Sequence, residues 1–229
     1  MPIKHKLCQL FLILNRIQKI FKRVYVKCIK MITTEEMKKL EEASEVSKVQ
    51  LMSNAGKGIF DVLNSRMDIK NKKVLLVCYH GNNGGDGFVA ANCLCDVSDV
   101  TVLFVGDEDK FKEEGGVNYK KMLKNSKIQL LHDASDIDFG DFDYIIDAIL
   151  GTGSESGLKE PIASVVDQIN ESGAFKIAVD VPTGMNPDTG EVVDKVVNAD
   201  LVVSFHDIKK GLEGIKDKVV VVDIGIKDS

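Results

Sequence analysis

Apolar residues from position 31 onward form two alternating patterns. Seven short runs are almost entirely apolar, at 74–79, 100–105, 128–131, 144–150, 176–181, 201–205 and 219–224. Runs without polar alternation are typical of strands that are buried on both faces. Helical periodicity occurs at 33–63, after the glycine-rich segment 81–87, at 111–123 and at 162–170. The alternation predicts one α/β domain in which a mostly parallel sheet lies between two layers of helices.

Small residues interrupt the first helical segment. Ala55, Gly56 and Gly58 occur among larger apolar residues, which predicts either a close contact with another helix or a break in this one. The start of the segment is better defined, because Thr33 is followed three residues later by Glu36 and so matches a capping box.

A glycine-rich segment follows the first predicted strand and reads Gly81-Asn82-Asn83-Gly84-Gly85-Asp86-Gly87. We expect a turn here and then a helix, whose first N–H groups have no partner within the helix and can bind an anion. The segment lacks the Gly-Lys-Ser/Thr of a P-loop and the glycine spacing of a dinucleotide fingerprint. A small-molecule kinase and a nicotinamide-dependent dehydrogenase are therefore disfavoured.

Polar and glycine residues also follow three other predicted strands. Asp147 precedes a Gly-Thr-Gly segment, Asp180 precedes Val-Pro-Thr-Gly, and Ser204 precedes His206 and a Lys-Lys-Gly sequence. In open parallel sheets, ligands bind outside the carboxyl ends of the strands. We therefore expect one shared ligand site along this edge of the sheet.

Composition limits the class of protein. The 229-residue chain is 44% hydrophobic and 28% charged, as in ordinary globular proteins, and its net charge of −5 argues against a nucleic-acid partner. The five cysteines have no metal-binding spacing. They are typical of free thiols in a reducing compartment, so we expect a cytoplasmic protein.

The first thirty residues differ from the rest. They contain eight Lys or Arg residues and no acidic residue, with apolar residues at helical spacing. Two interpretations remain open for residues 1–30: a basic amphipathic extension that binds a membrane or directs targeting, and a dispensable extension with Met31 as the true start. The predicted domain is residues 31–229 in either case.

Four segments, in this order, carry a resemblance to a known family: GNNGGDGFVAA, DAILGTG, AVDVPTGMNPDTG and SFHDIKKGL. The chain from Met31 resembles the NAD(P)H-hydrate epimerase family, also called the YjeF N-terminal domain. The resemblance implies a Rossmann-like αβα sandwich that interconverts the R and S epimers of hydrated NADH and NADPH in cofactor repair. It also implies a bound potassium ion, a homodimer, and a separate NAD(P)H-hydrate dehydratase that acts on one epimer.

The resemblance assigns roles to individual residues. Asp180 would contact the hydrated ring, and because one carboxylate can serve both proton transfers in turn, we expect it to be the acid/base catalyst. The other residues that would line the substrate are Asn82, Asn83, Gly84, Gly85, Asp86, Gly151, Thr152, Gly153, Ser154, Glu155, Ser156 and Gly157. The potassium ligands would be Asn83, Asp147 and Thr183.

This sequence departs from the family pattern at two positions. Thr183 replaces the more usual Ser and keeps the hydroxyl, and Glu155 adds a negative charge that puts a preference for NADPH in doubt. The residues by themselves leave the roles of His206, Lys209 and Lys210 open. Two adjacent lysines before a glycine are typical of a solvated turn.

A noncatalytic dimeric scaffold on the same fold is the main alternative. A scaffold needs neither Asp180 nor the glycine-rich segment, so their presence favours the enzyme. Binding of NADPH or its hydrate would distinguish the two.

Overall fold

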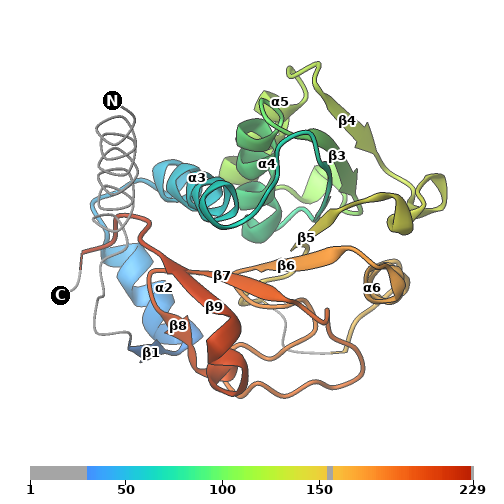
Figure 1. The fold of residues 1–229 in the computed structure, drawn as a ribbon. Helices are drawn as coiled ribbons and strands as arrows, with labels where there is room; N and C mark the ends of the chain where they lie inside the picture. Colours follow the sequence, from blue (N-terminus) through green and yellow to red (C-terminus); the bar gives the residue numbers. More distant parts are fainter. Residues whose placement is uncertain (1–29, 154–156, 228–229) are drawn as a thin grey trace, which may run out of the picture. The chain divides into compact units, whose positions relative to one another are not determined.

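The computed structural model describes residues 30–153 and 157–227, and its centre is a parallel sheet (Figure 1). Seven strands lie in the order β4 (Ile128–Leu131), β3 (Asp99–Phe104), β2 (Lys73–Cys78), β5 (Tyr144–Ala148), β6 (Phe175–Val179), β7 (Leu201–Phe205) and β9 (Val219–Val222). Every neighbouring pair is parallel. The seven strands predicted from apolar runs are confirmed, with ends shifted by two residues at most.

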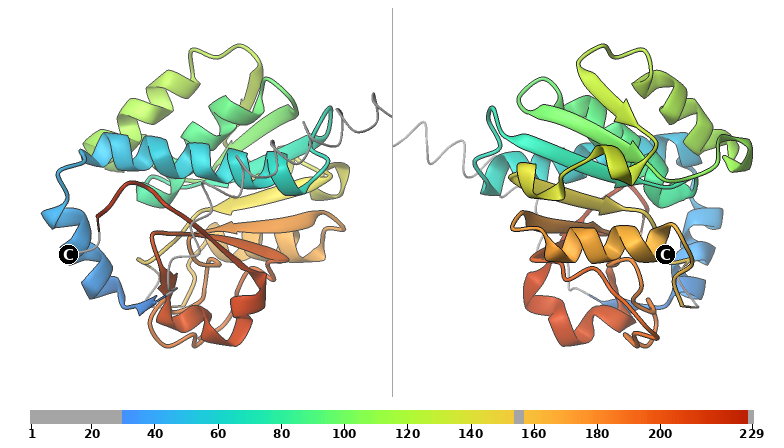
Figure 2. Two further views of the ribbon diagram at one scale, coloured as in Figure 1. Left: turned by 60° about the vertical axis from the view of Figure 1, so that its left-hand side comes forward. Right: turned by 90° about the vertical axis from the view of Figure 1, so that its right-hand side faces the viewer.

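Helices cover both faces of this sheet, which makes it the middle of three layers. The two views in Figure 2 show α3 (Lys48–Arg66) on one face and α6 (Ile162–Glu171) on the other. Strand β2 shows why continuous apolar runs are needed, since Val74 and Leu76 pack in the core beneath α3, α4 (Asn82–Leu94) and α5 (Glu113–Met122). Leu75 and Val77 belong to the core beneath α6.

The helix expected at 33–63 is two helices, so that prediction is wrong. Helix α2 (Thr34–Ala43) ends before Ser44, and α3 begins after Ser47, whose hydroxyl accepts the N–H of Gln50 at 3.3 Å. The small residues instead make close contacts, because a Cβ on Gly56 would lie 2.4 Å from the Val89 Cβ of α4. The predicted capping box of Thr33 and Glu36 is confirmed.

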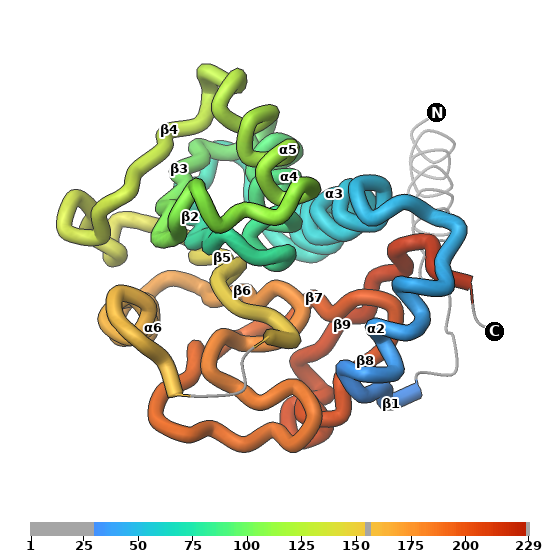
Figure 3. The backbone as a smooth tube through the Cα atoms, turned by 180° about the vertical axis from the view of Figure 1, so that it is seen from behind, coloured from blue at the N-terminus to red at the C-terminus, as the bar shows by residue number. Residues whose placement is uncertain are grey.

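A second, two-stranded sheet lies beside α2. Strand β1 (Met31–Ile32) pairs with β8 (Ile208–Lys209), as Figure 3 shows from behind. The N–H and hydroxyl of Thr34 both donate to Asp188, at 2.8 and 2.7 Å, and hold the start of α2 in place. The 3₁₀ helices are η1 (Glu108–Lys110), η2 (Ala134–Asp136), η3 (Phe139–Asp141) and η4 (Lys210–Lys218). The small sheet was not predicted, because two-residue strands carry no periodicity.

The basic helix expected in the N-terminal extension lies outside the described residues, apart from Lys30, which is exposed. Within the described part of the chain, no helix is long and apolar enough to cross a membrane.

Candidate functional site

The strand order reverses between β2 and β5. The chain runs from β2 outward through β3 to β4, then returns to β5 and continues through β6 and β7 to β9. At such a switch point the loops after the two central strands diverge and leave a crevice at their carboxyl ends. Helix α4 follows β2 at this point, Asp147 lies near the end of β5, and Asp180 follows β6 directly.

Helix α4 begins earlier than expected. The segment predicted as a glycine-rich turn is already helical from Asn82, and no glycine between 81 and 87 has a positive φ. Gly81 is the N-cap and makes no side-chain capping bond, so no N-cap side chain occupies the first N–H groups of the helix. This places anion-binding donors at the predicted position, on a helix end instead of a loop.

The glycines of α4 are required by close packing. A Cβ on Gly84 would lie 1.8 Å from the backbone oxygen of Tyr79, at the end of β2. A Cβ on Gly85 would lie 2.5 Å from the sulfur of Met52, and one on Gly87 would lie 2.7 Å from the sulfur of Cys78. The start of α4 is therefore pressed against the sheet and α3.

Asp147 and Thr183 form a buried hydrogen-bonded pair across β5 and the loop after β6. The N–H of Thr183 donates to Asp147 Oδ2 at 2.8 Å, and its hydroxyl donates to Oδ1 at 2.7 Å. The hydroxyl also accepts the N–H of Leu150 at 2.9 Å. Burial raises the pKa of Asp147 to about 6, although the hydrogen bonds from Thr183 oppose this.

Asn83 lies next to Gly151, which follows Leu150, the residue whose N–H binds the Thr183 hydroxyl. A Cβ on Gly151 would lie 3.1 Å from Asn83 Oδ1, so this side chain reaches the residue after Leu150. The Asn83 amide nitrogen is buried and has no hydrogen-bond partner among the described residues. The structure thus brings all three predicted potassium ligands, Asn83, Asp147 and Thr183, to the switch point.

Asp180 has an unusual backbone and a buried cationic partner. Its φ is +63°, in the left-handed region that Asp tolerates better than most residues. Lys209 donates to Asp180 Oδ1, and its side chain is only 1% exposed. The Ser204 hydroxyl and the Phe205 N–H approach the same oxygen, at 3.4 and 3.3 Å. Oδ2 has no hydrogen-bond donor in the part of the chain that the structure describes.

The two adjacent lysines have different environments. Lys209 is buried and also donates to the Phe205 carbonyl at 2.9 Å. Lys210 is half exposed, with its ammonium 3.9 Å from a Glu36 oxygen. The expectation of a solvated turn is therefore wrong for Lys209. His206, with a φ of +65°, is buried.

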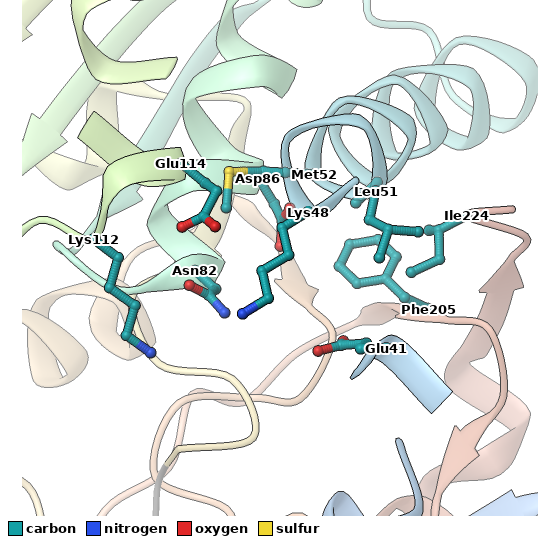
Figure 4. A pocket seen from close by; sticks show the side chains of 11 residues that line it. Glu41, Lys48, Leu51, Met52, Asn82, Asp86, Lys112, Glu114, Phe205 and Ile224 are labelled. Atoms are coloured by element: carbon teal, nitrogen blue, oxygen red, sulfur yellow. The ribbon is translucent and has the colours of Figure 1, made fainter. Parts of the chain in front are cut away.

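A pocket opens at the N-terminal end of α4 (Figure 4). Its apolar side comprises Leu51, Met52, Ala55, Phe205 and Ile224, and its polar side comprises Glu41, Lys48, Asn82, Asp86, Lys112 and Glu114. Figure 4 shows the Lys48 ammonium and the Asn82 amide pointing toward one another across it. Asn82 and Asp86 are the predicted site residues among this lining.

Two carboxyl groups in the pocket have raised pKa values. Burial raises the pKa of Asp86 well above its ordinary value, and the charges of Asp180 and Glu41 raise it further. Burial and the charge of Asp180 also raise the pKa of Glu41. Asp86, Glu41 and Asp180 therefore form one electrostatic cluster, which Lys209 partly neutralises.

The segment after β5 is described only in part. Thr152 and Gly153 follow Gly151 in the turn beside Asn83, whereas Ser154, Glu155 and Ser156 lie outside the described residues. A Cβ on Gly157 would lie 3.3 Å from an Asp194 carboxyl oxygen, so the chain here packs on the loop after β6.

The fold and this crevice define a doubly wound α/β ligand-binding domain. The chain belongs to the family described as YjeF-related protein N-terminus, whose model matches residues 48–211. The structure is similar to that of the yeast protein YNL200c, with a TM-score of 0.72 and 21% identity over 84% of this chain and 87% of that one. At this identity the likeness shows the fold.

Curated relatives are more similar in sequence. A bifunctional NAD(P)H-hydrate repair enzyme from Methanothermobacter thermautotrophicus is 38% identical over 193 residues, which cover 79% of this chain and 37% of the relative. An NAD(P)H-hydrate epimerase from Nitrosopumilus maritimus is 35% identical over 193 residues, which cover 81% of this chain and 89% of the relative. The chain spans 37% to 43% of the length of three bifunctional relatives.

Proposed function

We propose that this protein is an NAD(P)H-hydrate epimerase, which interconverts the R and S epimers of hydrated NADH and NADPH. The observation that carries the proposal is the Asp180 carboxylate, whose Oδ1 is held by Lys209 while Oδ2 accepts no hydrogen bond from the described residues. A relative of similar length, from Nitrosopumilus maritimus, has this activity in its name.

The reaction requires proton transfer and orientation. The hydroxyl of the hydrated ring is bonded to the carbon beside the ring nitrogen, so the nitrogen lone pair can expel it once it is protonated. Water then adds to the opposite face of the ring and gives up a proton. A carboxyl group fixed within hydrogen-bond reach can transfer these protons. Asp180 Oδ2 would have this role, because Lys209, Ser204 and Phe205 fix the carboxylate through its other oxygen.

The pocket at α4 suits the rest of the substrate. The uncapped N-terminus of α4 favours the pyrophosphate, and Lys48 and Lys112 add positive charge to the lining. The predicted contacts of Asn82, Asn83, Gly84, Gly85 and Asp86 with the substrate remain predictions, as do those of Gly151–Gly157.

We also propose a potassium site formed by Asn83, Asp147 and Thr183. The unpartnered amide of Asn83 supports it, because exchanging the positions of its oxygen and nitrogen would present a further oxygen ligand. Amide, hydroxyl and carboxylate oxygens are the donors that hard cations prefer. When bound, the ion would supply positive charge that holds the segment after β5 against the loop after β6.

We propose that the protein is a homodimer and that it acts together with a separate NAD(P)H-hydrate dehydratase. The bifunctional relatives support the link to a dehydratase, since their chains extend well beyond the matched domain and leave room for another repair activity. Light scattering measures the oligomeric state, and a monomer at micromolar concentration would contradict the proposed homodimer.

The decisive experiment follows one epimer of hydrated NADH over time. The protein should produce the other epimer faster than the spontaneous reaction in the same buffer. Asp180→Asn serves as the matched inactive protein, because it keeps the shape of the side chain. A wild-type rate equal to the spontaneous rate would refute the proposed function, and calorimetric titration of NADPH would then test whether the protein is a scaffold that binds no cofactor.

A further inference from the structure

Asp86 is a buried acid without a structural partner. Its side chain lies on α4 and lines the pocket in Figure 4, yet the residue is only 9% exposed. No hydrogen bond or ion pair within the described ranges 30–153 and 157–227 involves its carboxyl group. A buried carboxylate without donors is costly, so burial raises the pKa of Asp86 and favours the protonated form.

Helix formation does not explain Asp86. It lies in the second turn of α4, past the positions where a side chain can cap the first N–H groups, and the N-cap itself is Gly81. An apolar or amide side chain would fill the same space at lower cost. An acid that is kept neutral beside other carboxyl groups in a cleft is instead typical of proton-transfer sites.

We propose that Asp86 is a second catalytic acid/base residue, which transfers a proton at one face of the hydrated ring while Asp180 transfers one at the other. This inference rests on the proposed epimerase function. Asp86 lies on α4 and lines the pocket, whereas Asp180 follows β6, so the two carboxyl groups come from different elements, and the charge of Asp180 acts on Asp86. Inversion needs two faces, because the hydroxyl leaves from one and water adds to the other.

The two carboxyl groups would act in sequence. Protonated Asp86 donates its proton to the hydroxyl, the carbon–oxygen bond breaks, and the ring nitrogen lone pair forms a carbon–nitrogen double bond as water departs. A second water forms a bond to the same carbon from the opposite face, the electron pair returns to nitrogen, and Asp180 Oδ2 takes the proton from that water. Asp86 is then ionised and Asp180 protonated, which is the form required for the reverse direction. Exchange with solvent restores the starting form.

The protonation states suit these roles. Lys209, Ser204 and Phe205 all donate to Asp180 Oδ1, which leaves Oδ2 as the oxygen that can accept a proton. Burial, and then the charges of Asp180 and Glu41, raise the pKa of Asp86 and favour its neutral form, while Lys209 opposes this. The other charged groups of the pocket are Lys48 on α3 and Lys112 and Glu114 at the start of α5.

This arrangement predicts the direction of a pH effect. A general acid is active while it is protonated, so kcat/KM should fall as pH rises through the raised pKa of Asp86. Removing the negative charge of Glu41 should lower the pKa of Asp86 and move this decrease to lower pH. Glu42 supplies a matched control, because it lies on the same helix with an exposed side chain and does not line the pocket.

The test compares wild type, Asp86→Asn, Glu41→Gln and Glu42→Gln on one epimer of hydrated NADH across a pH range, after subtraction of the spontaneous rate. Asp86→Asn should lose roughly 10²-fold or more in kcat/KM and the decrease at high pH. Glu41→Gln should shift that decrease to lower pH, and Glu42→Gln should leave it in place.

The outcomes separate the two proposals. A wild-type protein that does not accelerate epimerisation refutes the function itself. An active wild type with an Asp86→Asn variant of equal rate, or of lower rate with an unchanged pH profile, overturns the role of Asp86 alone. If Asp86→Asn does not fold, the Glu41→Gln profile decides: a shift supports the role, and a profile identical to that of Glu42→Gln overturns it.

Discussion

Adjacent glycines at the start of α4 should respond very differently to the same substitution. In Gly84→Ala, the new Cβ would lie 1.8 Å from the oxygen, 2.8 Å from the carbon and 2.9 Å from the nitrogen of Tyr79, all backbone atoms. In Gly85→Ala, the Cβ would lie 2.5 and 2.7 Å from the sulfur and terminal carbon of Met52, the flexible end of a side chain. Only the first clash forces α4 away from β2.

The expected magnitudes follow from this contrast. Replacing a helical glycine with alanine stabilises a helix by about 1 kcal/mol. Overpacking against a movable side chain costs about 1–3 kcal/mol, so Gly85→Ala should change stability by no more than about 2 kcal/mol. Gly84→Ala cannot relax by rotating a side chain, and we expect a net loss of about 3–5 kcal/mol.

Thermal unfolding of the two variants beside wild type measures this difference. At about 2–4 °C per kcal/mol for a domain of this size, Gly84→Ala should lower Tm by about 6–20 °C. Gly85→Ala should stay within a few degrees of wild type. An equal or larger decrease for Gly85→Ala would refute the packing argument, and so would a Gly84→Ala protein that unfolds at the wild-type temperature.

Three further substitutions test the groups around the switch point. Asp180→Asn should lower the epimerisation rate by roughly 10²–10⁴-fold and also lower Tm, because buried Lys209 loses its carboxylate partner; full activity would exclude Asp180 as acid/base catalyst. Asp147→Ala should abolish the increase in Tm on adding potassium, because a ligand stabilises only the state that binds it; a surviving increase would place the ion elsewhere. Lys209→Met should cost about 3–5 kcal/mol in urea unfolding by leaving Asp180 unpaired, whereas half-exposed Lys210→Met should be nearly neutral. Equal losses would contradict the buried ion pair.

The sheet could be predicted because both of its faces are covered. Each strand, such as β2 or β7, must present apolar side chains in both directions, and this leaves continuous runs that stand out from the helices. The break between α2 and α3 could not be found in the same way. Apolar residues such as Leu40, Val46 and Leu51 occur on both sides of it, and the helices separate because Ser44 and Ser47 adopt extended backbone.

The positions of site residues could be predicted from the sequence where the order of the parallel strands alone determines them. Parallel strands place Asp147 and Asp180 at one edge of the sheet, and Thr183 follows within three residues of Asp180. The conformation of the glycine-rich segment was harder to predict from the sequence. Glycines at 84, 85 and 87 are typical of a loop, yet here they allow a helix to pack against Tyr79, Met52 and Cys78, and these contacts depend on the tertiary fold.

The sequence did not predict which charged residues of the site lie close to one another, yet these pairings determine the chemistry of the site. Lys209 and Lys210 are identical neighbours in the sequence, but pairing of β8 with β1 accompanies the burial of one, while the other stays near the surface. Asp86 lies near a helix N-terminus, where the helix dipole by itself would favour its ionised form. Burial and the charges of Asp180, which follows β6, and of Glu41 on α2 raise its pKa instead. A carboxyl group's protonation state is thus set by residues distant in sequence, so the assignment of acid and base requires the folded arrangement.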